Sequence, residues 1–304
     1  MYHLARLDPT QETHSGWLRA RFCSGLSFSA VLLSILSACG GGAGGTTPTR
    51  EATPVTPSIA PANSPPPQTR PPDTTVITLL GLYTPGVEAR FSDVDLRITH
   101  LINVANDIYS DSGAEITLSL KYLGQVNYSD SVDAPTALDE LTFESVPGLE
   151  GIAALRDLYE ADLVVLFKDY ANDGYCGYAW VGGFQKQGDF SDPAEADFGY
   201  SVVSANCSDY TLAHEIGHNL GLAHSWRETD QGGTFTYARG YGLDNDFTTV
   251  MANPAAFNAI QLPLLSSPDR LCNRQPCGVS YTENQGADAT RAIKISKDQV
   301  AAYR

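Results

Sequence analysis

The stretch TLAHEIGHNLGLAHS, residues 211–225, places three histidines, one glutamate and two glycines at fixed spacing within an apolar run. His214 and His218 are four residues apart, so a helix presents both imidazoles on one face. Gly221 follows at a point where a helix can end in the left-handed conformation that glycine adopts without strain. The chain can then turn sharply and bring His224 beside the first two histidines. This motif therefore predicts a helix, then a tight turn, and then a segment that brings His224 back toward the helix.

We expect this helix to begin at a cap formed by Ser208 or Asp209 and to run through Leu220. Three neutral imidazoles suit one Zn²⁺ ion, and three protein ligands leave a fourth position open for water, as in catalytic zinc sites. Glu215, adjacent to the first ligand, is placed to act as a general base toward zinc-bound water. The chemistry implied is hydrolysis of an amide, with a peptide bond as the obvious substrate.

A purely structural role for the three histidines in a core is the alternative. The full pattern HExxHxxGxxH would arise by chance in roughly 0.001% of chains of this length. Four histidines follow residue 39, and only His100 lies outside the motif. We expect His100 on a helix surface, since nothing nearby in the sequence supplies a second ligand. The pattern thus favours a metal site.

The motif HEIGHNLGLAH resembles the zinc signature of the metzincin metallopeptidases, and its spacing matches fully. The second characteristic feature of metzincins is a methionine in a tight turn beneath the zinc ligands. The resemblance implies that Met251, in FTTVMANP, is this methionine. The surrounding sequence is most similar to bacterial reprolysin-like, or adamalysin-type, enzymes. Reprolysins usually have an aspartate after the third histidine, whereas this chain has Ser225. Asn253 stands where astacins and serralysins have an extra tyrosine ligand.

The resemblance implies an α/β (α+β) metzincin-like zincin. Its upper lobe has a twisted, mostly parallel sheet with helices, and its irregular lower lobe has the Met-turn and a C-terminal helix. The sequence pattern agrees, because strands and helices alternate. Expected strands are 76–83, 115–123, 161–167, 177–184 and 198–204. Expected helices are one capped by Ser92 with an apolar face at Val94, Leu96, Ile98, Leu101, Ile102 and Ile108, one at 148–159 and one at 287–303.

Substrate binding is also implied by the resemblance. An extended peptide would add to the exposed edge strand of the sheet, with a simple packed strand as the alternative reading. We place this edge strand at Ala179, Trp180, Val181 and Gly182. Residues 256–265 would line the pocket that selects the side chain beyond the cleaved bond. An apolar wall there would draw on Phe257, Ile260, Leu262 and Leu264.

Four cysteines lie beyond the N-terminal region, and an exported chain usually oxidises such a set. Three pairings are possible, and we favour Cys176–Cys207 with Cys272–Cys277. A thiolate-zinc site is the competing interpretation. It is disfavoured because no pair has CxxC spacing.

The N-terminus is typical of an exported protein. Residues 1–38 are expected to be a lipoprotein-type signal peptide, because an apolar run ends in Leu-Ser-Ala-Cys, which resembles the lipobox of bacterial lipoproteins. The resemblance implies that Cys39 is lipidated. Residues 39–75 contain the GGGAGG run and nine of the eighteen prolines, which predicts an extended stalk. Residues 76–304 would form the catalytic domain. The protein would then be a lipoprotein of the bacterial outer membrane or cell surface, or, alternatively, a secreted protein.

The sequence as a whole predicts a monomeric zinc endopeptidase acting on proteins or peptides. The net charge of −16 argues against nucleic acid as a partner, because phosphates would be repelled. A catalytically silent surface binding protein on the same scaffold is the alternative, but it would not need Glu215. A zinc-delivery protein would be expected to have histidine-rich or acid-rich flexible loops. Structural Ca²⁺ is a further candidate, although no loop has a recognisable ligand spacing.

Overall fold

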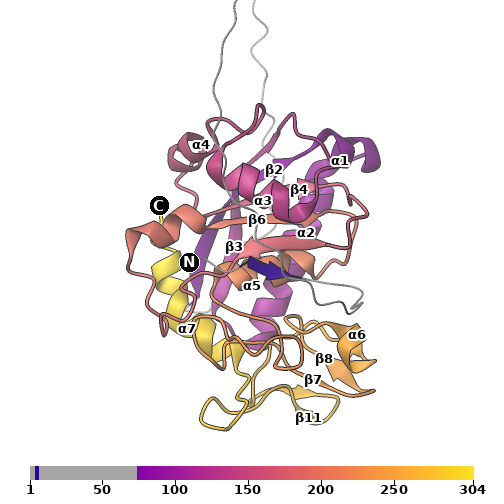
Figure 1. The fold of residues 1–304 in the computed structure, drawn as a ribbon, viewed down its shortest axis with the longest axis vertical. Helices are drawn as coiled ribbons and strands as arrows, with labels where there is room; N and C mark the ends of the chain where they lie inside the picture. The colour runs from indigo at the N-terminus through magenta and orange to yellow at the C-terminus, as the bar shows by residue number, and fades with distance from the viewer. Residues whose placement is uncertain (1–3, 7–73) are drawn as a thin grey trace, which may run out of the picture. The chain divides into compact units, whose positions relative to one another are not determined.

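In the computed structural model, residues 4–6 and 74–304 are described, and Cys39, the stalk and the rest of the expected signal peptide lie outside them. The main sheet has six strands in the order β1-β5-β6-β4-β2-β3 (Figure 1). Their bounds are β1 (Leu4–Arg6), β2 (Thr75–Tyr83), β3 (Ile116–Gln125), β4 (Leu163–Lys168), β5 (Gly177–Trp180) and β6 (Tyr200–Ser204). The three long strands that we expected from the sequence are therefore present, with ends shifted by one or two residues.

The sheet is mostly parallel, as expected. Strands β2, β3, β4 and β6 run parallel, whereas β5 is antiparallel to β6, and β1 is antiparallel to β5. Side chains of β2 enter two cores on opposite faces: Ile77 and Leu79 enter one, and Leu80 and Leu82 the other. Burial on both faces explains why the strands are almost continuously apolar.

Helices cover both faces of the sheet. One face packs against α2 (Val94–Ser112), α5 (Thr211–Asn219) and α7 (Ala289–Val300), and the other against α3 (Ala134–Phe143) and α4 (Ile152–Leu158). A short helix α1 (Pro85–Arg90) follows β2, and the 3₁₀ helix η1 (Pro193–Phe198) precedes β6. Among the described residues, no helix is both long and apolar enough to span a bilayer.

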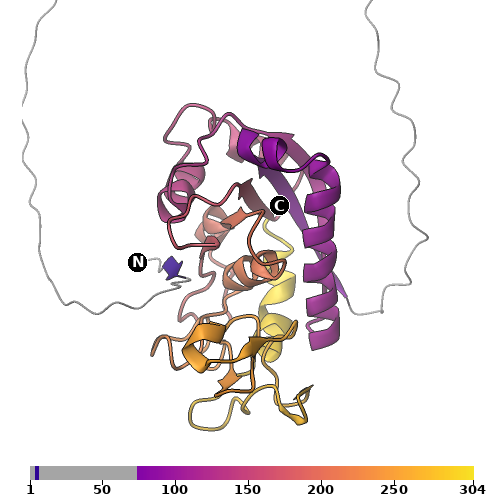
Figure 2. The same ribbon diagram turned by 90° about the vertical axis from the view of Figure 1, so that its right-hand side faces the viewer.

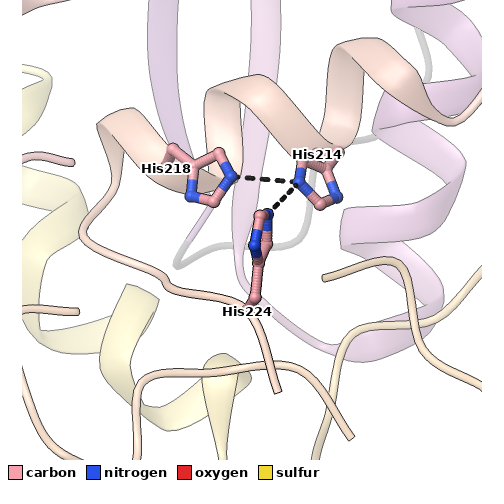
Figure 3. Close-up of side chains that lie close together, drawn as sticks. All are labelled: His214, His218 and His224. Carbon is pink, nitrogen blue, oxygen red and sulfur yellow. Dashed lines mark hydrogen bonds between the residues drawn. The ribbon is translucent and has the colours of Figure 1, made fainter. Parts of the chain in front are cut away.

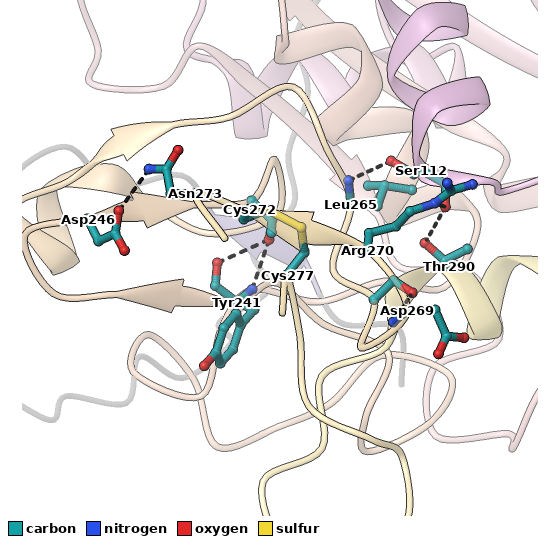
Figure 4. The surroundings of a disulfide bond; sticks show 12 residues. Ser112, Tyr241, Asp246, Leu265, Asp269, Arg270, Cys272, Asn273, Cys277 and Thr290 are labelled. Carbon is teal, nitrogen blue, oxygen red and sulfur yellow. Dashed lines mark hydrogen bonds between the residues drawn. A yellow bond between two sulfur atoms is a disulfide. The ribbon is translucent and has the colours of Figure 1, made fainter. Parts of the chain in front are cut away.

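The residues after α5 form an irregular lower lobe, seen in orange and yellow at one end of the molecule in Figure 2. It has a three-stranded sheet of β7 (Gly242–Leu243), β8 (Phe247–Thr248) and β9 (Ile260–Gln261), a hairpin of β10 (Leu271–Cys272) and β11 (Gln275–Pro276), and the one-turn helix α6 (Pro254–Phe257). Ser112 at the end of α2 joins this lobe to the upper one. Its hydroxyl accepts from Leu265 N at 2.8 Å, and its carbonyl accepts from Arg270 and Thr290 (Figure 4).

The structure has the two disulfides favoured from the sequence, so these four cysteines are not thiolate ligands. Cys176–Cys207 joins the start of β5 to the loop before α5. Cys272–Cys277 closes the β10–β11 hairpin (Figure 4).

Three expectations about helices were wrong. The cap of α2 is Asp93, whose carboxylate accepts from Leu96 N, and not Ser92. Leu96 is 66% exposed, because a residue two positions from Val94 and Ile98 points away from the stripe that those residues share. Helix α3 was missed, although Asp133 caps it and a proline stands in its first turn. The capping residue and the proline therefore indicate the start of α3, which the apolar pattern alone does not reveal.

Candidate metal centre

Helix α5 begins later and ends earlier than expected. Its N-cap is Tyr210, which makes no side-chain capping bond, and its last residue is Asn219. Ser208 lies outside the helix, where its hydroxyl accepts from Tyr210 N at 3.2 Å. Asp209 instead pairs with Arg97 of α2 at 2.7 Å, because that cation lies beside it in the folded protein.

The turn after α5 has the expected form. Gly221 has φ +91°, the left-handed conformation in which a side chain would be strained. Its N–H donates to His218 O at 2.8 Å, and Leu222 N donates to Gly217 O at 2.9 Å. These bonds satisfy the last carbonyls of the helix and reverse the chain. His224 is thereby delivered to the face of α5.

The three imidazoles converge on one point (Figure 3). The Nε2 atom of His214 lies 3.0 Å from that of His218 and 3.1 Å from that of His224. Two outer nitrogens are held by backbone: His214 Nδ1 lies 2.8 Å from Val250 O, and His218 Nδ1 lies 2.8 Å from Leu222 O. Because a carbonyl only accepts, each Nδ1 carries the proton and each Nε2 presents a lone pair inward.

This cluster fits a cation. Burial lowers the pKa of His214 to about 4, and it lowers the pKa of His218 and of His224 well below the ordinary value. Three neutral rings with lone pairs about 3 Å apart would repel one another unless a positive ion lay between them. Within residues 4–6 and 74–304, these are the three side chains placed to share a metal ion. Three neutral nitrogen donors are a typical catalytic zinc set.

Glu215 lies next to the first ligand and is only 1% exposed. Neither carboxylate oxygen has a hydrogen-bond partner among the described residues, and burial raises the pKa of this group well above its ordinary value. An unpaired buried carboxylate is costly. The carboxylate of Glu215 is thus free to bind a water molecule or a substrate group.

Met251 lies beneath the metal-binding helix. It is fully buried, and a Cβ atom on Gly217 would lie 2.7 Å from its sulfur. Gly217 sits between the two ligands on α5, so the helix can approach the methionine only because this residue lacks a side chain. The adjacent Val250 carbonyl is the one that orients His214. The structure therefore places Met251 where a Met-turn methionine is expected.

The sequence profile of the metallopeptidase family M12B, reprolysin-like, matches residues 74–282. The chain belongs to this family. The reprolysin-like family relationship also accounts for the sheet, the metal cluster and the Met-turn within one fold. Zinc is the metal that the family implies, and His214, His218 and His224 are the residues that would hold it.

This reprolysin-like chain has relatives among characterised proteins. It is 34% identical over 250 residues to "Peptidyl-Asp metalloendopeptidase" of Pseudomonas aeruginosa, a match covering 75% of this chain and 40% of the relative. It is 29% identical over 202 residues to a protein of the same name from Xanthomonas campestris, covering 66% and 45% of the two chains. The chain thus spans less than half the length of these relatives.

A solved structure shares the fold. A chain in "Structure of a chaperone-substrate complex" superposes with a TM-score of 0.58 at 22% identity, covering 76% of this chain and 35% of that one. At this identity the likeness concerns the fold alone.

The expected substrate strand is shorter in the structure. Ala179 and Trp180 belong to β5, but Val181 and Gly182 follow its end. Gly182 N donates to His218 O at 3.0 Å, so the chain leaves the sheet there to bind the metal helix. On the outer edge of β5, residues Tyr178–Trp180 pair with Leu4–Arg6 in antiparallel register.

A cavity of about 250 Å³ lies beside His214. It is bounded by the N-terminal end of α5 with Ser208, Tyr210 and Thr211, by Cys176, and by Asn253 and Gln261. Of residues 256–265, Gln261 is the one that lines this cavity, and the four apolar side chains expected in that segment are not among its lining residues. Leu262 and Leu264 pack into the core around Phe247, Phe257 is buried, and Ile260 is 62% exposed.

Two neighbours of the site gave no signal in the sequence. Gly177 at the start of β5 lies against Glu215, such that a Cβ there would be 2.4 Å from Glu215 Oε1. Glu228 binds both Ser225 and the backbone of Asn253. Glu215 is far from Gly177 along the chain, and Asn253 is far from Glu228, so no local spacing marks either contact.

Proposed function

We propose that this protein is a zinc-dependent endopeptidase in which Glu215 is the general base. The observation that carries the proposal is the convergence of three imidazole Nε2 atoms next to a buried carboxylate without a protein partner. When bound, zinc would polarise the scissile carbonyl and lower the pKa of a water molecule toward neutrality. His214, His218 and His224 would hold it.

Side chains and carbonyls of the protein would then transfer the proton of the attacking water and orient the metal ligands. Glu215 would take a proton from the attacking water and return it to the departing amine, which needs a group that is protonated and deprotonated in turn. Its burial excludes bulk water, so its charge acts in a medium of low dielectric constant. The carbonyls of Val250 and Leu222 keep two imidazoles in the tautomer that faces the metal position.

The substrate would lie along β5 as an added antiparallel strand. The pairing of Leu4–Arg6 with Tyr178–Trp180 supports this proposal, because the outer edge of β5 accepts main-chain hydrogen bonds in that direction. Such binding fixes the register of a peptide with little dependence on its side chains. Selectivity would then come from the cavity beside His214.

We propose aspartyl selectivity for that cavity, as the name of the relatives, peptidyl-Asp metalloendopeptidase, suggests. No lysine or arginine is among the described residues that line it. A substrate carboxylate would instead be held by the N-terminal end of α5, where Tyr210 provides no side-chain cap, and by hydroxyl and amide groups such as Thr211 and Gln261. Helix N-termini favour anions through their free N–H groups and dipole.

Digestion of a peptide library tests both proposals. We expect cleavage at aspartyl residues, loss of cleavage after a chelator removes zinc, and recovery when zinc is restored. Matched peptides with asparagine in place of aspartate should be cleaved more slowly, and mass spectrometry would identify the bonds. Cleavage without preference for aspartate would overturn the selectivity alone. A protein that holds one zinc and cleaves nothing would instead favour the silent binding scaffold.

We also propose export as a lipoprotein, anchored through Cys39 with residues 40–75 as the spacer. The apolar run before Cys39 and the two disulfides support an exported chain. We expect Cys39→Ser to release the protein from membranes on fractionation and to abolish labelling by a radioactive fatty acid. Cys23→Ser is the matched control, because it removes the other leader cysteine and should leave both signals intact. Membrane association that persists in Cys39→Ser would refute the lipid anchor.

A further inference from the structure

Glu228 lies at the junction of two segments that surround the metal centre. Its Oε2 atom accepts three hydrogen bonds: from Ser225 Oγ at 2.5 Å, from Ser225 N at 3.3 Å and from Asn253 N at 3.1 Å. Ser225 is buried, with 2% of its surface exposed. A charged acceptor with several donors in a water-poor site makes stronger bonds than a neutral one. One carboxylate oxygen thus connects two backbone segments.

Each of the two residues that Glu228 binds lies next to an element of the metal centre. Ser225 directly follows His224, the third ligand. Asn253 comes two residues after Met251, caps helix α6 through its side chain, and lines the cavity beside His214. A shift of Glu228 would therefore displace the third ligand, the turn beneath α5 and the cavity wall.

We propose that Glu228 is a positioning residue that holds His224 and the Met251 turn in their metal-binding arrangement. Ser225 occupies the position where reprolysins usually have an aspartate, and its hydroxyl reaches the carboxylate that this chain supplies three residues later. The inference rests on the zinc site of the proposed function, but not on catalytic turnover.

Zinc affinity is the decisive readout, measured by competition with a chromophoric chelator on the full chain. We expect Glu228→Ala to weaken zinc binding about 10- to 100-fold, the usual effect of removing a group that orients a metal ligand. Glu228→Gln should stay within a few-fold of the parent protein, because its amide oxygen can still accept from Asn253 N. Glu283→Ala is the matched control, since it removes an exposed glutamate of the same lobe.

Ser225→Ala keeps the test decisive if Glu228→Ala does not fold. It deletes the hydroxyl donor while the bond from Asn253 N remains, so zinc affinity should fall below that of the parent and of Glu283→Ala, and parental affinity in Ser225→Ala would overturn the proposal. Unchanged zinc affinity in a folded Glu228→Ala protein, or an equal loss in Glu283→Ala, would overturn the proposal. A parent protein that binds zinc and cleaves no peptide would contradict the proposed function and leave this measurement intact.

Discussion

We expect replacement of Glu215 with glutamine to lower kcat for peptide cleavage by about 10²- to 10⁴-fold, the usual contribution of a general base. Glutamine has nearly the same shape but cannot take the proton from the attacking water. It also removes a buried charge that no described residue satisfies, so we expect the variant to fold at least as stably as the parent. The measurements are kcat, KM, zinc content and the midpoint of thermal unfolding.

Zinc content separates a chemical effect from a structural one. The Glu215→Gln protein should retain one zinc per chain, because its three ligands and their carbonyl partners are unchanged. Glu283→Gln, an exposed substitution of the same kind, should leave kcat unaltered. Turnover near the parental rate in Glu215→Gln would remove this residue from the proton-transfer step.

The second large effect is expected at Gly177. An alanine Cβ there would lie 2.4 Å from Glu215 Oε1, 2.6 Å from its Cγ and 2.7 Å from its Cδ, all closer than real atoms approach. The backbone of β5 is held by its ladder to β6 and by the adjacent disulfide at Cys176, so the Glu215 side chain must move instead. Displacement of a catalytic group by about 1 Å can cost about 10²-fold in rate. We therefore expect Gly177→Ala to lose about that factor in kcat while keeping its zinc.

A double-mutant cycle tests this contact directly. The side chain of Glu215→Ala ends at Cβ and lacks the Cγ, Cδ and Oε1 atoms that the added methyl group would meet, so Gly177→Ala should lower kcat much less in that background than in the parent. Equal costs in both backgrounds would mean that the two residues do not interact. Thermal unfolding of each variant would show whether β5 itself has been disturbed.

Much of the upper lobe was predictable because its signals are local. Strands β2 and β4 were recognisable as apolar runs, because parallel strands buried on both faces are apolar on both, and β3 was recognisable from its alternating pattern. The limits of α5 were less predictable. Asp209 is a good capping residue by type, but it pairs with Arg97 in the folded protein, and the helix starts at Thr211 after the N-cap Tyr210, which makes no side-chain capping bond.

The cavity wall shows where a local pattern misleads. Leu262 and Leu264 are apolar and lie in the right segment, yet they pack against the small core of the lower lobe, and Phe257 is buried. That core forms around Phe247 and the Cys272–Cys277 disulfide. The apolar side chains of this segment are therefore not the ones that line the cavity. The polar Gln261 lines it instead.

The sequence by itself determined the metal ligands, because their geometry is local. Four residues on a helix place His214 and His218 on one face, and a glycine that tolerates positive φ returns the chain with His224. Only the tertiary structure decided that Gly177 lies against Glu215 and that Glu228 binds the backbone of Asn253. These contacts join segments distant along the chain, so they depend on how the sheet, α5 and the lower lobe pack together. No spacing of residues encodes such packing.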